Sequence, residues 1–194
     1  MFTTKVFPTL RSFDYKKGSI TSFDDAYNWN NYYTFGKESV LNSFVRHEIV
    51  EEEVLVSDSE IKMFQENVDE NIVSTIKENP DIQFYYFLTP YSILWWDHTI
   101  RTNTLNKHLY GEKMVIESII DFDNVHLFSF SNDFTLTTNL DNYKDVAHYG
   151  ENVNSYILKN MFEGKYRLTK HNYENYQKQI KEYYLNYNYD EIYK

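Results

Sequence analysis

An aspartate and a histidine three positions apart could act together as an acid–base pair. Asp145 and His148 lie in the segment 139–150, which is rich in Asn and Asp and ends at Gly150. This composition is typical of a loop, and the residues after Gly150 predict a helix. A carboxylate beside an imidazole fixes the tautomer of the ring and stabilises its protonated form. His148 is therefore a candidate general base oriented by Asp145. The alternative is that Asp145 caps a turn and His148 is a half-exposed surface residue.

Composition restricts the classes of function. The chain has 194 residues, enough for one α/β domain. It carries 29 acidic against 19 basic residues and a net charge of −10. Phosphate contacts need clustered Lys and Arg, so the charge argues against a nucleic-acid partner or an anionic membrane surface. The chain has no cysteine, which rules out disulfides, a thiol nucleophile and thiolate metal sites.

The other histidines and the acidic cluster of the N-terminal part are better explained by structural roles than by a metal or cation site. Asp97-His98 and His108 lack the spacing of a metal site, and both histidines are expected on the surface, so no metal or other cofactor is expected. The acidic residues between 48 and 60 could hold a cation, but a solvated flank of a helix is favoured. The chain start lacks the apolar stretch of a signal peptide, and no apolar run approaches the roughly 18 residues of a membrane span. As written, the sequence is expected to stay in the cytoplasm without a membrane segment.

Hydrophobic periodicity predicts alternating helices and strands from residue 59 onward. We expect helices over 59–78, 104–122 and 151–163 and from Thr169, with strands over 82–88 and 125–130. Short connections between such elements are typical of a parallel sheet with right-handed crossovers. The expected fold is α/β, with a mostly parallel sheet flanked by helices in three layers over 59–194. Residues 1–58 are expected to form an irregular arm.

The carboxyl ends of parallel strands are the usual place for a site. Residues 89–96 and 131–133 follow the two predicted strands and should meet the 139–150 loop at one rim. Ser92 is a candidate nucleophile there, although a turn whose hydroxyl binds the backbone is the favoured alternative. Tyr91, Trp95 and Trp96 are candidates for stacking on a sugar ring, with packing in the core or at the rim as the alternative.

Four segments, taken in order, resemble the C-terminal half of the SGNH (GDSL-type) hydrolase superfamily. They are 79–84 with 89–92, 124–128, 139–149 and 166–170. The similarity is greatest to SGNH-like proteins encoded with bacterial cell-envelope polysaccharide genes, and it covers about residues 65–194. Asp145 and His148 match the family's Asp-x-x-His block, which supplies the acid and base of a Ser-His-Asp triad. The resemblance implies a flavodoxin-like three-layer fold and ester chemistry on O-acyl groups of an envelope glycan.

The family's first block, Gly-Asp-Ser or Gly-x-Ser after an N-terminal strand, has no counterpart here. Gly18-Ser19 is the only Gly-Ser pair, and no apolar strand precedes it. A His-Asp pair without a nucleophile cannot form an acyl-enzyme, so we expect a truncated or split family member that is inactive alone. The alternative function is a non-catalytic module that binds glycan or protein through its aromatic rim.

The missing block also bears on partners and location. The first strand of such a sheet is usually central, so a chain without it should expose strand edges. A homo-oligomer or a complementary chain that completes the site is therefore expected, with an O-acylated carbohydrate as the other partner. A longer parent chain would be expected at the cell envelope.

Overall fold

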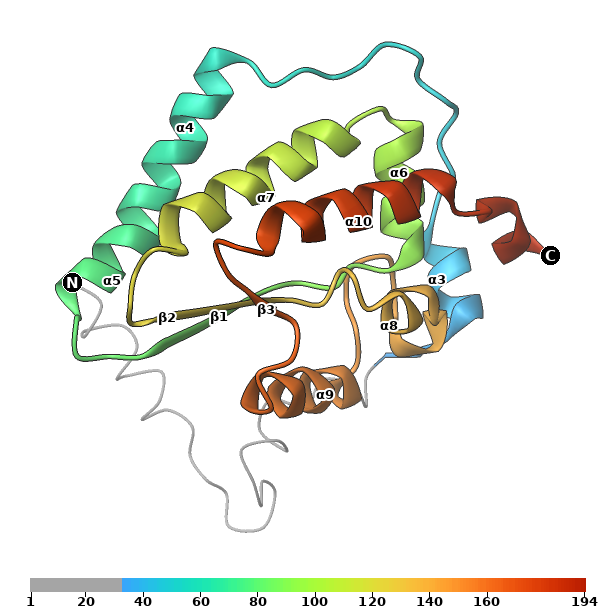
Figure 1. Ribbon diagram of the computed structural model, residues 1–194. Coiled ribbons are helices and arrows are strands. Elements are labelled where there is room, and N and C mark those ends of the chain that lie inside the picture. The colour runs from blue at the N-terminus through green and yellow to red at the C-terminus, as the bar shows by residue number, and fades with distance from the viewer. Residues whose placement is uncertain (1–32) are drawn as a thin grey trace, which may run out of the picture. The chain divides into compact units, whose positions relative to one another are not determined.

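The computed structural model describes residues 33–194, and its compact unit begins at Phe35 (Figure 1). The strands are β1 (Phe84–Leu88), β2 (Val125–Ser129) and β3 (Arg167–Leu168). The helices are α3 (Lys37–Ser43), α4 (Asp58–Val68), the π-helical turn η2 (Asp69–Val73), α5 (Ser74–Glu78), α6 (Ile93–Arg101), α7 (Leu105–Ile119), α8 (Phe134–Thr138), the 3-10 turn η3 (Leu140–Asn142), α9 (Glu151–Phe162), α10 (Tyr173–Asn186) and the 3-10 turn η4 (Tyr189–Tyr193).

The sheet has the order β1-β2-β3 and is mixed. β1 and β2 are parallel, as predicted, with Phe84 beside Val125. β3 is antiparallel to β2, so the mostly parallel sheet is realised only in part. Gly164 and Tyr166 have φ angles of 71° and 59°, and these turn the chain back after α9 so that β3 runs against β2. The α/β class is confirmed, with a small mixed sheet.

Helix α4 begins where its sequence supplies a capping box. The Ser57 hydroxyl accepts a hydrogen bond from the backbone N–H of Glu60, and the Glu60 carboxylate accepts one from the backbone N–H of Ser57 at 3.0 Å. These bonds satisfy donors that the first turn of a helix leaves without partners. The helix then runs through η2 and α5, close to the predicted range 59–78.

The two faces of the sheet pack against different helices. Figure 1 shows α7 and α10 side by side over one face and α9 against the other. Val125 and Leu127 of β2 belong to the larger core, whereas Phe128 packs with Val153 and Ile157 of α9. This alternation follows from the two-residue period of a strand.

Residues before 59 depart from the predicted arm. Helix α3 lies within this range, its Val40 is fully buried, and the N–H of Gly36 donates to the Tyr143 carbonyl at 2.9 Å. The segment after α3 is extended, and Val50 and Val54 donate backbone hydrogen bonds to the end of α6 and the turn after it. This helix was not predicted because seven residues are too few to show a clear period. The remainder of the expected arm, residues 1–32, lies outside the described residues.

Helix α6 was not predicted either, because residues 89–96 were interpreted as the connection that follows the first strand, and a nine-residue helix gives only a short periodic signal. Trp96 of this helix is fully buried and stacks on Tyr184 of α10, with ring centroids 4.0 Å apart. Asp97 of the same helix is also buried, and its carboxylate accepts a hydrogen bond from Arg46 at 2.9 Å.

Replacing Trp96 should therefore destabilise the fold. We expect Trp96→Ala to lower the free energy of unfolding by about 3–5 kcal/mol, because it removes a buried indole and leaves a cavity. Urea denaturation followed by circular dichroism measures the change. Phe162→Ala is the control, since that side chain is 94% exposed and its loss should have little effect. Equal stability of the two variants would contradict the placement of Trp96 in the core.

Candidate functional site

The structure brings Asp145 and His148 together, as their spacing predicts. His148 Nδ1 lies 2.9 Å from both carboxylate oxygens of Asp145. Asp145 Oδ1 also accepts backbone hydrogen bonds from Ala147 at 2.9 Å and His148 at 2.8 Å. The N–H of Lys144 donates to the carbonyl of His148 at 3.0 Å and closes the loop. The Asp145 carboxylate thus stabilises the turn and also orients the imidazole of His148.

The electrostatics of this pair suit an acid–base role. Partial burial opposes ionisation of Asp145, but the hydrogen bonds from Ala147 and His148 outweigh it and lower the pKa of the carboxyl group. Lys144 Nζ, 3.7 Å from Asp145 Oδ2, adds a positive charge nearby. The His148 side chain is 61% exposed and therefore accessible to a substrate. With Nδ1 engaged by the carboxylate, Nε2 is the nitrogen that would take up a proton.

Ser92 lies beside this loop but does not serve as a nucleophile in the geometry observed. Its side chain is fully buried, and its hydroxyl donates to the carbonyl of Val146 at 2.8 Å. The backbone N–H of Ser92 reaches the same carbonyl at 3.1 Å. Ser92 therefore ties the 144–148 loop to the start of α6, and its hydroxyl proton points to the backbone instead of to His148.

The three aromatic candidates separate into two groups. Trp96 is a core residue and has no face available for a sugar ring. Tyr91 and Trp95 are half-buried and stack on each other, with centroids 4.5 Å apart and ring planes 20° apart. Trp95 also meets the edge of the His108 ring at 4.4 Å. Tyr91 and Trp95 alone form the rim, and Trp96 contacts Trp95 in a T-shaped arrangement with ring centroids 5.0 Å apart.

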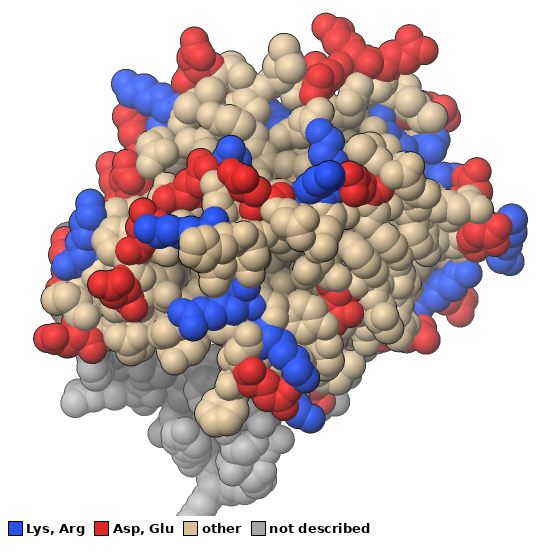
Figure 2. Space-filling model, in the orientation of Figure 1, with Lys and Arg blue, Asp and Glu red and all other residues tan. Residues whose placement is uncertain are grey.

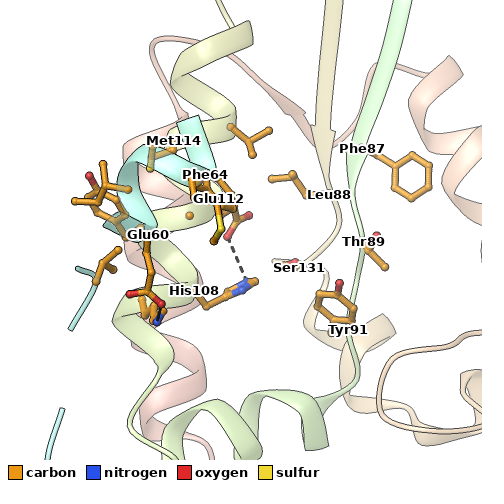
Figure 3. A pocket seen from close by; sticks show the side chains of 17 residues that line it. Glu60, Phe64, Phe87, Leu88, Thr89, Tyr91, His108, Glu112, Met114 and Ser131 are labelled. Atoms are coloured by element: carbon orange, nitrogen blue, oxygen red, sulfur yellow. Dashed lines mark hydrogen bonds and ion pairs between the residues drawn. The ribbon is translucent and has the colours of Figure 1, made fainter. Parts of the chain in front are cut away.

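Sequence reasoning missed a cavity of about 480 Å³ at the carboxyl ends of β1 and β2 (Figure 3). Thr89 and Tyr91 line it after β1, and Ser131 lines it after β2. Helices α4 and α7 form the remaining walls. The lining residues are Val56, Glu60, Ile61, Met63, Phe64, Phe87, Leu88, Thr89, Tyr91, Lys107, His108, Tyr110, Gly111, Glu112, Met114, Val115 and Ser131. The volume is within the usual range of a small-molecule site.

Glu112 and His108 of α7 are the lining residues whose pKa values are shifted most by burial. Glu112 Oε1 accepts a hydrogen bond from the Tyr176 hydroxyl at 2.5 Å, whereas Glu112 Oε2 lies 4.0 Å from His108 Nε2. Burial raises the pKa of Glu112 to about 7 and lowers the pKa of His108 to about 4. The prediction that His108 is a surface residue is therefore wrong. Its spacing of four residues from Glu112, in a predicted helix, was the available signal that both share a face.

The charges on the surface are mixed. On the face in Figure 2, Lys and Arg side chains lie among Asp and Glu side chains and form no continuous basic patch. Within residues 33–194, no three His, Asp or Glu side chains are grouped as a metal site requires. In the same range, no helix has the length and apolar character needed to cross a membrane.

Comparisons with protein-family models, with curated proteins and with solved structures found no match to this chain. Membership of the SGNH superfamily therefore stays a sequence-based prediction.

The Asp145 turn should open in acid. The lowered pKa means that this carboxylate stabilises the fold above its unfolded pKa, and that the contribution is lost as the pH falls through the folded pKa. We expect the amide resonances of Ala147 and His148 to shift in NMR spectra with a midpoint below 3.8, the ordinary value for aspartate. Asp145→Asn should abolish this transition. A midpoint at or above the ordinary value would show that the hydrogen bonds do not favour the ionised form.

Proposed function

We propose that this chain carries the acid–base part of an SGNH-type site that hydrolyses esters or transfers acyl groups. The observation that carries the proposal is the contact of His148 Nδ1 with Asp145 at 2.9 Å in an exposed loop. An imidazole held in this way can take the proton of a hydroxyl group as its oxygen attacks an ester carbonyl. The proposed substrates, O-acyl groups of an envelope glycan, follow from the sequence resemblance.

The nucleophilic hydroxyl is proposed to come from a complementary chain. β1 is an edge strand of the described sheet, and an open edge accepts a further strand. Tyr85 and Phe87 of β1 are 58% and 36% exposed. Tyr85 contacts Phe128, and Phe87 contacts Phe130, on the sheet face that packs against α9. Helix α9 covers Phe128 and Phe130 but leaves Tyr85 and Phe87 partly exposed. Strands added at this edge would complete the three-layer, mostly parallel arrangement of the family, and a second copy of this chain is the alternative occupant.

Acyl transfer to an added alcohol tests the acid–base role without the missing nucleophile. With p-nitrophenyl acetate and methanol, we expect the chain to accelerate ester cleavage slightly, because His148 can assist the added hydroxyl. His148→Ala and Asp145→Asn should each remove most of this acceleration, which we expect to be well below the factor of about 10²–10⁴ that a complete general-base site provides. His171→Ala is the control, since His171 is an exposed histidine outside the loop.

Equal rates for the wild type and His148→Ala would overturn the acid–base role. A fluorophosphonate probe addresses the second part of the proposal. We expect it to label no residue of the pure chain. Labelling of one serine would show that the chain holds its own nucleophile and needs no complementary chain.

A non-catalytic binding module is the second candidate, and the parallel Tyr91–Trp95 pair favours it because a sugar ring can extend such a stack. In this case an O-acetylated oligosaccharide should bind the chain in calorimetric titrations. Tyr91→Ala should weaken binding about two- to tenfold, since an aromatic contact is worth ~0.5–1.5 kcal/mol. His148→Ala should leave binding unchanged. Affinity that is insensitive to Tyr91→Ala would rule out the rim as the binding surface.

A further inference from the structure

The cavity between α4 and α7 combines apolar walls with one buried acidic group. In Figure 3, Phe64 and Met114 lie on one side of it and Tyr91 on the other, with His108 and Glu112 between them. The Glu112 side chain is only 6% exposed. A carboxylate at this depth is costly unless hydrogen bonds and a compensating charge accompany it.

Half of this carboxylate is unsatisfied. Tyr176 donates to Oε1, and the Tyr176 hydroxyl is itself 2.6 Å from Ser129 Oγ. Oε2 is buried and has no hydrogen-bond partner among the described residues, because His108 Nε2 is too distant at 4.0 Å. A buried acceptor without a donor destabilises the protein, so a ligand that supplies the donor is bound more tightly for doing so.

Among residues 33–194, no positive charge compensates Glu112. Lys107 is the only Lys or Arg among the described residues that line the cavity, and its ammonium group is bound to the Glu60 carboxylate at 2.5 Å. His108, on the same helix, is neutral near pH 7 because burial lowers its pKa to about 4. The other titratable groups near Glu112 are the phenols of Tyr176 and Tyr184 on α10, and their raised pKa values keep them neutral. Ser129 and Ser131 face it from the β2 side with uncharged hydroxyl groups.

We propose that the cavity binds an organic amine with an apolar body, whose ammonium group donates a hydrogen bond to Glu112 Oε2. The ammonium group supplies both the missing donor and the missing positive charge. The apolar body would occupy the space beside Phe64 and Met114, and the ring of Tyr91 favours a cation nearby. An alcohol would supply the donor without the charge, and an anion would be repelled by Glu112. This site is separate from the Asp145–His148 pair, and the proposal does not depend on the role of that pair.

Binding of the amine should depend on pH through Glu112. The ammonium ion pairs with the ionised carboxylate, whereas the free protein holds this group with a pKa of about 7. Between a pH of about 8 and a pH of about 6, the ionised fraction falls about tenfold, and the apparent affinity should fall with it. The amine remains protonated over this interval, so its own titration does not contribute.

The matched probes 4-phenylbutylamine and 4-phenylbutanol test the proposal by isothermal titration calorimetry on the full chain. At the higher pH, we expect the amine to bind about tenfold more tightly than the alcohol. Glu112→Gln should remove this preference and the pH dependence. Glu117→Gln should change neither, because Glu117 lies on the same helix but has an exposed side chain.

Equal affinity of the wild type for the two probes, or no binding of the amine, would overturn the proposal. Equal affinities of Glu112→Gln and Glu117→Gln for the amine would also overturn the proposal, because the amine would then bind to the acidic surface and not to Glu112. Methyl NMR of the wild type gives a second readout if Glu112→Gln fails to fold. The amine should shift the methyl resonances of Met63 and Met114, which line the cavity, and leave that of Met161, which lies in the α9 core. If the amine did not shift the methyl resonances of Met63 and Met114, binding in the cavity would be contradicted.

Discussion

The stack of Trp96 on Tyr184 fixes helix α6, and both candidate sites depend on the position of this helix. At its start, Ser92 holds the carbonyl of Val146 and thereby the loop that carries Asp145 and His148. On its other side, Trp95 and Trp96 meet the ring of His108, which lines the cavity. One buried aromatic contact thus positions an exposed acid–base pair and the wall of a cavity.

Tyrosine provides much of the core and also its polar contacts. Tyr143, Tyr184 and Tyr189 are buried, and their hydroxyl groups donate to the backbone carbonyls of Pro90, Ser131 and Tyr184, respectively. A buried phenol needs such a partner, and irregular connections and the last turn of a helix offer carbonyls that no other backbone group uses. The high tyrosine content therefore stabilises the loops at the strand ends as well as the core, and the candidate site residues lie on or beside these loops.

The two sites obtain their electrostatic properties from opposite causes. At Asp145, three hydrogen bonds favour the charged carboxylate in a loop that reaches the solvent. At Glu112, loss of solvent favours the neutral acid, and the single bond from Tyr176 only partly offsets it. The first arrangement suits a group that stays ionised while its histidine exchanges a proton. The second leaves the ionised carboxylate without a compensating charge, which the ammonium group of the proposed ligand would supply.

Features that depend on neighbouring residues could be predicted from the sequence alone. The amphipathic pattern from Ile61 to Ile76 predicted the long helix of α4, η2 and α5, and the short connections predicted the parallel pair of β1 and β2. The contact of Asp145 with His148 was predictable because they lie three positions apart in one loop. The burial of Ser92 and Trp96, the antiparallel course of β3 and the cavity around Glu112 could not be predicted in this way. Each of these rests on contacts between segments some fifty or more residues apart, such as Ser92 with Val146 and Glu112 with Tyr176, or on a local turn such as that after α9. Local pattern carries no information on such distant pairings, because they are selected by how whole elements pack.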